Sequence, residues 1–267
     1  MFARLNYDYA GKYLLEFSGR YDGTSRFGSG NRYGFFPSVS GGWRISEESF
    51  FTPIKPVISD LKVRASYGSL GNQLAANRNS SSFYPYLPLM TSAQSNWLIN
   101  GEKTQYVTMP AAVSPDLTWE KSETLNFGID FQLFKKLNAS VDIYNRKTIG
   151  MLTKGATLPG VFGADAPSMN SANLSTKGFE MQLTWRDHFN LAGKTFSYSV
   201  GAVLSDYTTE VTKYKNNPNK IIETRVNYMG SYLDDSQFFT SPYKGQDVGE
   251  IWGFTVDGYF KSDAEAQ

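Results

Sequence analysis

The sequence predicts an all-β protein: an antiparallel transmembrane β-barrel, present as a partial, open wall of about eight to nine strands with long extracellular loops. Three observations predict this fold. Apolar and polar side chains alternate in segments of about ten residues, the connections alternate between short and long, and aromatic residues gather near strand ends. Successive side chains of a strand point to opposite faces, so each segment has one apolar and one polar face.

The alternation is clearest over residues 12–22, where Tyr13, Leu15, Phe17 and Tyr21 occupy one face and charged or polar residues occupy the other. The same period predicts strands over residues 2–9, 12–22, 33–45, 61–70, 118–134, 137–147, 174–186 and 194–206. A ninth, weaker segment lies near residues 251–259.

The connections fall into two sets by length. Residues 10–11, 46–60, 134–136 and 187–193 form the shorter set, and residues 22–32, 71–117, 148–173 and 207–250 form the longer set. The last three segments of the longer set are expected as long outer loops. Short turns at one end and long loops at the other are typical of an outer-membrane barrel, in which the short turns are periplasmic.

Aromatic residues of the apolar phase form two expected rows. Tyr9, Tyr13, Trp43, Phe131, Trp185 and Phe196 lie near the short turns, and Tyr21, Tyr33, Tyr67 and Trp119 lie near the long loops. Two such rows would be the interfacial girdles of a barrel, but core aromatics of a soluble β-sandwich give the same pattern. The barrel and the sandwich differ in where they place five apolar residues: a barrel exposes them on one curved sheet, and a sandwich buries them between two sheets. These residues are Leu15, Phe17, Phe127, Ile129 and Leu183.

The amino-acid composition excludes several classes of function. The 267 residues are 40% hydrophobic with a mean hydropathy of −0.38, and no apolar run approaches the ~18 residues of a membrane helix. A net charge of +1 without a basic stretch gives no support for nucleic acid binding. The absence of cysteine excludes disulfides, thiol catalysis and cysteine-ligated metals. Strand-like residues follow Met1 at once and the far end is polar, so we expect an internal piece of a longer chain, without signal peptide.

Candidate catalytic groups are few. His188 is the single histidine and lies in the expected short turn 187–193. The carboxylate pairs Glu47–Glu48 and Asp234–Asp235 carry no diagnostic spacing, although the second pair is a minor candidate for calcium in an outer loop. We therefore expect no catalytic residue, no cofactor and no metal site.

Two sets of residues are candidates for contacts. Charged residues of the polar phase are expected to face the lumen, either contacting a plug or solute or compensating one another: Lys12, Glu16, Arg20, Lys62, Arg64, Asp130, Asp142 and Glu180. Aromatic residues of the loop 71–117 are candidate ligand contacts, because exposed rings stack on sugars and anchor interfaces: Tyr84, Tyr86, Trp97 and Tyr106. The alternative is that these rings pack against other loops.

An ordered set of motifs covers nearly the whole chain. It comprises GKYLL at 11–15, RYDGTSRFG at 20–28, FPSVSGGWRISEE at 36–48, LKVRASYGSLGNQ at 61–73, PDLTWEKS at 115–122, NFGIDF at 126–131, VDIYNRKT at 141–148, KGFE at 177–180 and GEIWGFTVDGYF at 249–260. This set resembles the SusC/RagA family of TonB-dependent outer-membrane transporters.

The resemblance implies a barrel of about 22 strands filled by a plug, of which this chain would be a C-terminal part without the plug. It implies the outer membrane of a Gram-negative, Bacteroidota-like cell, with membrane lipid, a SusD-like surface lipoprotein and TonB (through the plug) as partners. Its substrates would be oligosaccharides or peptides. The alternatives are a soluble all-β carbohydrate-binding or interaction module, and a barrel enzyme, which the single histidine opposes.

Overall fold

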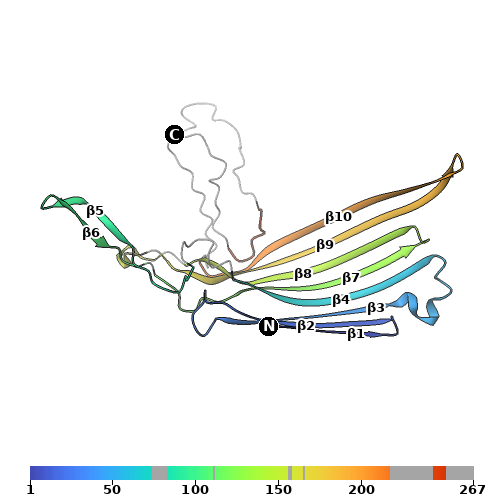
Figure 1. The fold of residues 1–267 in the computed structure, drawn as a ribbon, viewed down its shortest axis with the longest axis horizontal. Coiled ribbons are helices and arrows are strands. Elements are labelled where there is room, and N and C mark those ends of the chain that lie inside the picture. Colours follow the sequence, from blue (N-terminus) through green and yellow to red (C-terminus); the bar gives the residue numbers. More distant parts are fainter. Residues whose placement is uncertain (74–82, 111, 156–157, 165, 217–242, 251–267) are drawn as a thin grey trace, which may run out of the picture.

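One antiparallel sheet of eight strands dominates the structure, a computed structural model that describes residues 1–73, 83–110, 112–155, 158–164, 166–216 and 243–250. In Figure 1 the strands run side by side as long, curved ribbons. In spatial order they are β1 (Phe2–Tyr9), β2 (Tyr13–Gly23), β3 (Tyr33–Arg44), β4 (Ile58–Asn72), β7 (Glu120–Leu133), β8 (Leu137–Lys154), β9 (Ser168–Leu191) and β10 (Lys194–Tyr214).

The sheet does not close on itself. In the described part of the chain β1 pairs with β2 alone, and β10 pairs with β9 along its length. No α-helix occurs in the described ranges. The prediction of an all-β, antiparallel, open barrel wall is therefore confirmed.

Continuous pairing fixes the register across the whole sheet. One row of directly paired residues crosses all eight strands: Tyr9, Tyr13, Trp43, Val63, Ile129, Val141, Met181 and Leu204. Every member belongs to the apolar phase, so this register keeps one face of the sheet apolar from edge to edge.

The short connections lie together at one end of the sheet, on the right in Figure 1, and the long connections lie at the other end. Two hairpins of the sheet turn through Ala10–Gly11 and Ala192–Gly193, with φ of 56° and 67° in the first and 49° and 78° in the second. Positive φ at both central residues is the type I′ geometry, whose twist matches that of paired strands.

The β3–β4 connection carries two 3₁₀ helices, η1 (Ile45–Glu47) and η2 (Ser49–Phe51). Between them the Glu48 carboxylate accepts hydrogen bonds from the Tyr13 hydroxyl at 2.7 Å, the Lys12 ammonium at 3.0 Å and the Trp43 indole at 3.2 Å. These bonds tie the connection to β2 and β3. They also hold the pKa of the Glu48 carboxyl below its usual range, the Tyr13 bond having the largest effect.

Several strands are longer than predicted. β8 continues to Lys154 and β9 begins at Ser168, so the ends of the expected loop 148–173 are paired strand. The polar composition of residues 168–173 is typical of a loop. These residues nevertheless form a strand, because the neighbouring strand supplies their backbone hydrogen-bond partners. The predicted turn 187–193 is wrong for the same reason: β9 continues to Leu191, and His188 lies on a strand opposite Ser197.

The expected loop 71–117 contains a separate hairpin, β5 (Ser92–Ile99) and β6 (Glu102–Val107). It extends away from the long-loop end of the sheet in Figure 1. A further 3₁₀ helix, η4 (Gly160–Phe162), lies between β8 and β9. The expected ninth strand near 251–259 lies outside the described residues. None of the helices in the described ranges is long and apolar enough to cross a membrane.

Candidate functional site: the inner wall and the long-loop end

The apolar face of the sheet is not covered by a second sheet. Leu15, Phe17, Phe127 and Ile129 are 39%, 47%, 50% and 46% exposed, and Leu183 is half-buried among its strand neighbours. The soluble sandwich considered from the sequence would bury these residues between two sheets, so that alternative is wrong.

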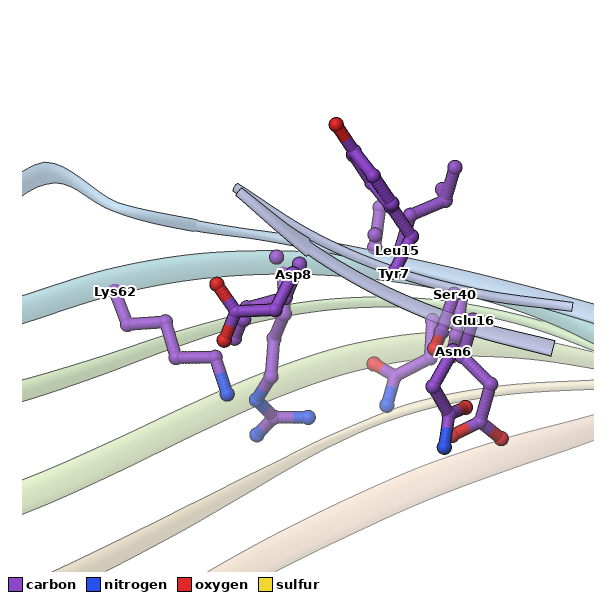
Figure 2. A pocket seen from close by; sticks show the side chains of 14 residues that line it. Asn6, Tyr7, Asp8, Leu15, Glu16, Ser40 and Lys62 are labelled. Atoms are coloured by element: carbon purple, nitrogen blue, oxygen red, sulfur yellow. The ribbon is translucent and has the colours of Figure 1, made fainter. Parts of the chain in front are cut away.

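The opposite face is polar and hollowed. Figure 2 shows Tyr7 and Leu15 on one side of the strands, and Asn6, Glu16 and Lys62 on the other. Residues of β1, β2, β3, β4 and β7 line a hollow of about 480 Å³ there. Side chains from five neighbouring strands converge in this way on the concave face of a curved sheet, which corresponds to the lumen of a barrel.

Arg64 organises the inner wall beside this hollow. Its guanidinium donates to both carboxylate oxygens of Asp130, at 3.1 and 3.3 Å, and to Asp142. Ser140 donates to Asp130 at 2.7 Å, and Asn126 donates to Asp142 at 2.9 Å. Two carboxylates and one guanidinium from three strands are thus held in a single network whose members are half-buried.

Glycine makes room for this network. A Cβ atom on Gly128 would lie 2.5 Å from Cζ of Arg64, so the guanidinium lies flat over the backbone of β7. Such close approach requires a residue without a side chain.

Most of the charges predicted to face the lumen are paired with opposite charges. Arg20 pairs with Asp22 at 2.6 Å and Glu16 with Arg4 at 3.4 Å. Lys12 precedes β2 and pairs with Glu48 at 3.0 Å, at the rim of the sheet. Within the described residues Lys62 and Glu180 have no ion-pair partner within 4.0 Å. Mutual compensation, one of the two interpretations left open by the sequence, accounts for the paired members.

An apolar cluster that the sequence did not predict lies at the long-loop end. Phe27, Phe36, Leu117 and Trp119 are 0–6% exposed and pack together, with Leu152 against them. The Trp119 ring lies 5.6 Å from that of Phe27 and 5.4 Å from that of Phe36. Its assignment to a lipid-facing girdle is wrong, because it precedes β7 and turns inward to this cluster.

A signal for the cluster is present in the sequence. Phe36 occupies the polar phase of β3, where an apolar ring needs a partner inside the barrel. Gly71 of β4 provides the space: a Cβ there would lie 2.0 Å from the ring of Phe36. Because the partners come from segments far apart in the chain, local periodicity could not identify them.

The four predicted ligand contacts come from three segments at the long-loop end. Tyr84 and Tyr86 lie in the loop before β5, with ring centroids 6.4 Å apart and nearly perpendicular planes. Trp97 is on β5 and Tyr106 is on β6, with 82% and 50% of their surfaces exposed. The hairpin therefore presents aromatic surface at the long-loop end, and the binding role of the four residues stays a prediction.

No cluster of three or more histidine, cysteine or acidic side chains able to hold a metal occurs in the described residues. The candidate calcium pair Asp234–Asp235 lies outside them.

Known proteins resemble this chain over most of its length. A family model described as "TonB dependent receptor-like, beta-barrel" matches residues 1–266. TonB-dependent receptor P26 of Formosa agariphila is 31% identical over 268 residues, which is 99% of this chain and 25% of the relative. TonB-dependent receptor SusC of Bacteroides thetaiotaomicron is 32% identical over 221 residues, which is 79% of this chain and 20% of that protein.

Solved structures agree with these relatives. The RagAB peptide importer in its closed-closed state matches with a TM-score of 0.66 and 30% identity, over 79% of this chain and 22% of that chain. The chain thus spans about a quarter or less of the length of each relative. These relatives are receptors and importers, and the prediction that the chain is not an enzyme is confirmed. The open sheet, its apolar outer face and its polar inner face agree with the family match over residues 1–266, and the chain belongs to the TonB-dependent receptor-like β-barrel family.

Proposed function

We propose that this chain forms part of the barrel wall and outer loops of a nutrient importer in the outer membrane of a Gram-negative, Bacteroidota-like bacterium. The observation that carries the proposal is the distribution of side chains on one open sheet, with exposed Leu15, Phe17, Phe127 and Ile129 on one face and the Arg64 network on the other. An apolar face of this kind fits hydrocarbon, and a polar hollowed face fits a water-filled passage.

The whole protein would take up oligosaccharides or peptides. The RagAB structures, which are of a peptide importer, support the peptide class. The oligosaccharide class comes from the resemblance to the SusC/RagA family that the motifs carry. A SusD-like surface lipoprotein would cover the long-loop end, and TonB would act through a plug supplied by another part of the full-length protein. The role of this chain would be that of a passive wall, because its inner charges are largely bound to one another.

Deletion of the full-length gene tests the proposal. We expect the protein to fractionate with the outer membrane, and we expect the deletion to abolish uptake of either fluorescent oligosaccharides or fluorescent peptides. Separate panels of the two substrate classes decide which class is transported. Recovery of the full-length protein in the soluble fraction, or unchanged uptake of both panels, would overturn the proposal.

We also propose that the loop aromatics Tyr84, Tyr86, Trp97 and Tyr106 contact the transported ligand. Trp97 gives the sharpest test because its ring is 82% exposed, so its removal disturbs little packing. Trp97→Ala in the full-length protein is expected to lower uptake about tenfold, as expected for a ring that stacks on the ligand. Val161→Ala on η4 is the matched control, because Val161 is 98% exposed but lies outside the β5–β6 hairpin. Equal uptake by the two variants would count against the aromatic contact.

A further inference from the structure

The chain contains a single Asn-Gly dipeptide, and this dipeptide forms the turn of the β5–β6 hairpin. Asn100 and Gly101 have φ of 57° and 83°, so both lie in the left-handed region that a two-residue hairpin turn requires. Both residues are exposed, and the hairpin extends away from the sheet in Figure 1. The dipeptide is therefore open to solvent in the described structure.

The two groups that react in asparagine deamidation are free at this turn. Within the described residues the backbone N–H of Gly101 donates to no acceptor, and the side chain of Asn100 makes no hydrogen bond. Nothing lies within 4 Å of the position that a Cβ atom on Gly101 would occupy. The side-chain carbonyl carbon of Asn100 can therefore approach the nitrogen of Gly101 without displacing another group.

Few strand pairs hold the turn in place. β5 and β6 form a separate two-stranded sheet, and their pairing is irregular between Gln94 and Leu98. Two residue pairs, of Leu98–Ile99 with Glu102–Lys103, lie between this irregularity and the turn. A two-stranded hairpin is only marginally stable in water. The tip can therefore open locally at a small cost in free energy, which gives the asparagine access to the conformation that cyclisation needs.

Two other asparagines lack this freedom. Asn96 is exposed on the same hairpin, but the backbone N–H of the next residue, Trp97, donates to the Ser95 hydroxyl at 3.0 Å. Asn170 precedes Ser171, which is 1% exposed, and the side-chain amide of Asn170 donates to two backbone carbonyls. These two residues provide internal references for the reactivity of the hairpin turn.

We propose that Asn100 is a site of spontaneous deamidation through a cyclic imide. The nitrogen of Gly101 forms a bond to Cγ of Asn100, and the bond from Cγ to the side-chain nitrogen breaks. Ammonia leaves and carries away the proton of the Gly101 amide. Water then opens the imide at either carbonyl, which gives aspartate or isoaspartate. Each product places a new negative charge beside Glu102, and isoaspartate also lengthens the main chain of the turn by a methylene group.

Peptide mapping of the full-length protein measures this reaction. The protein is kept in a nonionic detergent in warm, mildly alkaline buffer, and tandem mass spectrometry assigns each deamidation to one asparagine. We expect Asn100 to convert at least about tenfold faster than Asn96 and Asn170, because glycine leaves its own nitrogen open to attack. Isoaspartate should be the main product, since direct hydrolysis of the side-chain amide gives aspartate alone.

Two comparisons test the structural argument. Gly101→Ala adds a methyl group beside the attacking nitrogen and should slow the conversion of Asn100 about tenfold. Thr104→Ala on β6 is the matched control, because it removes atoms from the same hairpin outside the dipeptide and should leave the rate unchanged. A synthetic peptide of residues 94–107 supplies the rate of the unconstrained dipeptide, and the protein should react within about tenfold of it, since the tip opens readily.

Three results would each overturn the proposal. The first is an equal rate at Asn100 and Asn96, and the second is formation of aspartate without isoaspartate. The third is a rate in the protein more than about tenfold below that of the peptide, because the turn would then hold Asn100 away from the nitrogen of Gly101. The measurement does not involve uptake, so its failure and the failure of the proposed import function are distinguishable.

Discussion

Asn170 and Thr118 are joined by two hydrogen bonds in opposite directions. The side-chain oxygen of Asn170 accepts from the backbone N–H of Thr118 at 3.0 Å, and its amide donates to the carbonyl of Thr118, also at 3.0 Å. The amide donates in addition to the carbonyl of Gly150 at 2.6 Å. One side chain thus replaces a strand partner where the chain enters β7, beside the buried Leu117 and Trp119.

Asn170→Ala should therefore destabilise the long-loop end. The substitution leaves the half-buried backbone groups of Thr118 and the carbonyl of Gly150 without this partner, which costs about 1–3 kcal/mol. Equilibrium unfolding in detergent, followed by tryptophan fluorescence, measures the loss. Asn6→Ala is the control, since the side chain of Asn6 makes no hydrogen bond in the described structure, and a similar change in both variants would contradict the expected role.

Gly71→Ala should be destabilising through the apolar cluster. The added methyl group would lie 2.0 Å from the ring of Phe36, which is 4% exposed and cannot turn away freely. Overpacking of this kind costs about 1–3 kcal/mol. Gly41→Ala adds the same atom where nothing lies within 4 Å, so the two unfolding midpoints should differ clearly. Phe36→Leu in the Gly71→Ala background should restore part of the loss.

Acidification should loosen the β3–β4 connection. The pKa of Glu48 is lowered from its ordinary 4.5, mainly by the hydrogen bond from Tyr13, so its contribution to stability is complete above that value. It is lost as the pH falls below 4.5 and through the lowered pKa of the folded protein.

Glu48→Gln should therefore lower the unfolding midpoint at neutral pH and flatten its decline in acid. Glu102→Gln on β6 removes a carboxylate that lacks such donors in the described structure, and should leave the decline unchanged. A Glu48→Gln profile that runs parallel to that of the unsubstituted protein would show that these bonds do not contribute.

Neighbouring side chains of β4 should face different environments, lipid on the apolar face of the sheet and water on the polar face. Ala65 pairs with Phe127 of the apolar face, whereas Ser66 pairs with Asn126 of the inner hollow. The chain has no cysteine, so Ala65→Cys and Ser66→Cys each add the single thiol of this segment with little change in volume. In membranes of the full-length protein, Ala65→Cys should favour a lipid-soluble maleimide over a charged one, and Ser66→Cys should show the reverse preference. The same ratio at both positions would contradict the assignment of the two faces.

The sequence predicts the sheet well because its determinants are local. Alternation within 12–22 and a two-residue turn such as Ala10–Gly11 suffice to specify a strand and its neighbour. The β5–β6 hairpin was missed although its turn, Asn100–Gly101, is a strong hairpin signal, because the surrounding segment reads as an irregular loop.

The long-loop end could not be predicted in the same way. Trp119 meets Phe27 and Phe36 from segments about 80 to 90 residues away, and the side-chain contacts of Asn170 cross some 50 residues. The period of a strand contains no information about such partners. The pairing of His188 with Ser197 was missed for a related reason: the polar composition of residues 187–193 is typical of a turn, whereas β10 supplies strand partners as far as Leu191.

The paired row that begins at Tyr9 indicates how far the strands are tilted in the membrane. Tyr13 lies next to the first turn, but its row reaches β9 at Met181, and that hairpin turns only after Leu191. Between the β1–β2 turn and the β9–β10 turn, the position of the turn therefore shifts by about ten residues along the strand direction, or roughly 33 Å. The two turns are separated across the sheet by about six strand spacings of roughly 4.8 Å each. If all these turns lie at one membrane surface, the strands must be tilted by roughly 45–50° from the barrel axis, which is close to the usual strand tilt of closed barrels. Depth in the bilayer consequently follows a diagonal through the sheet, and Tyr13 and Phe189 can lie at one level although no register row joins them.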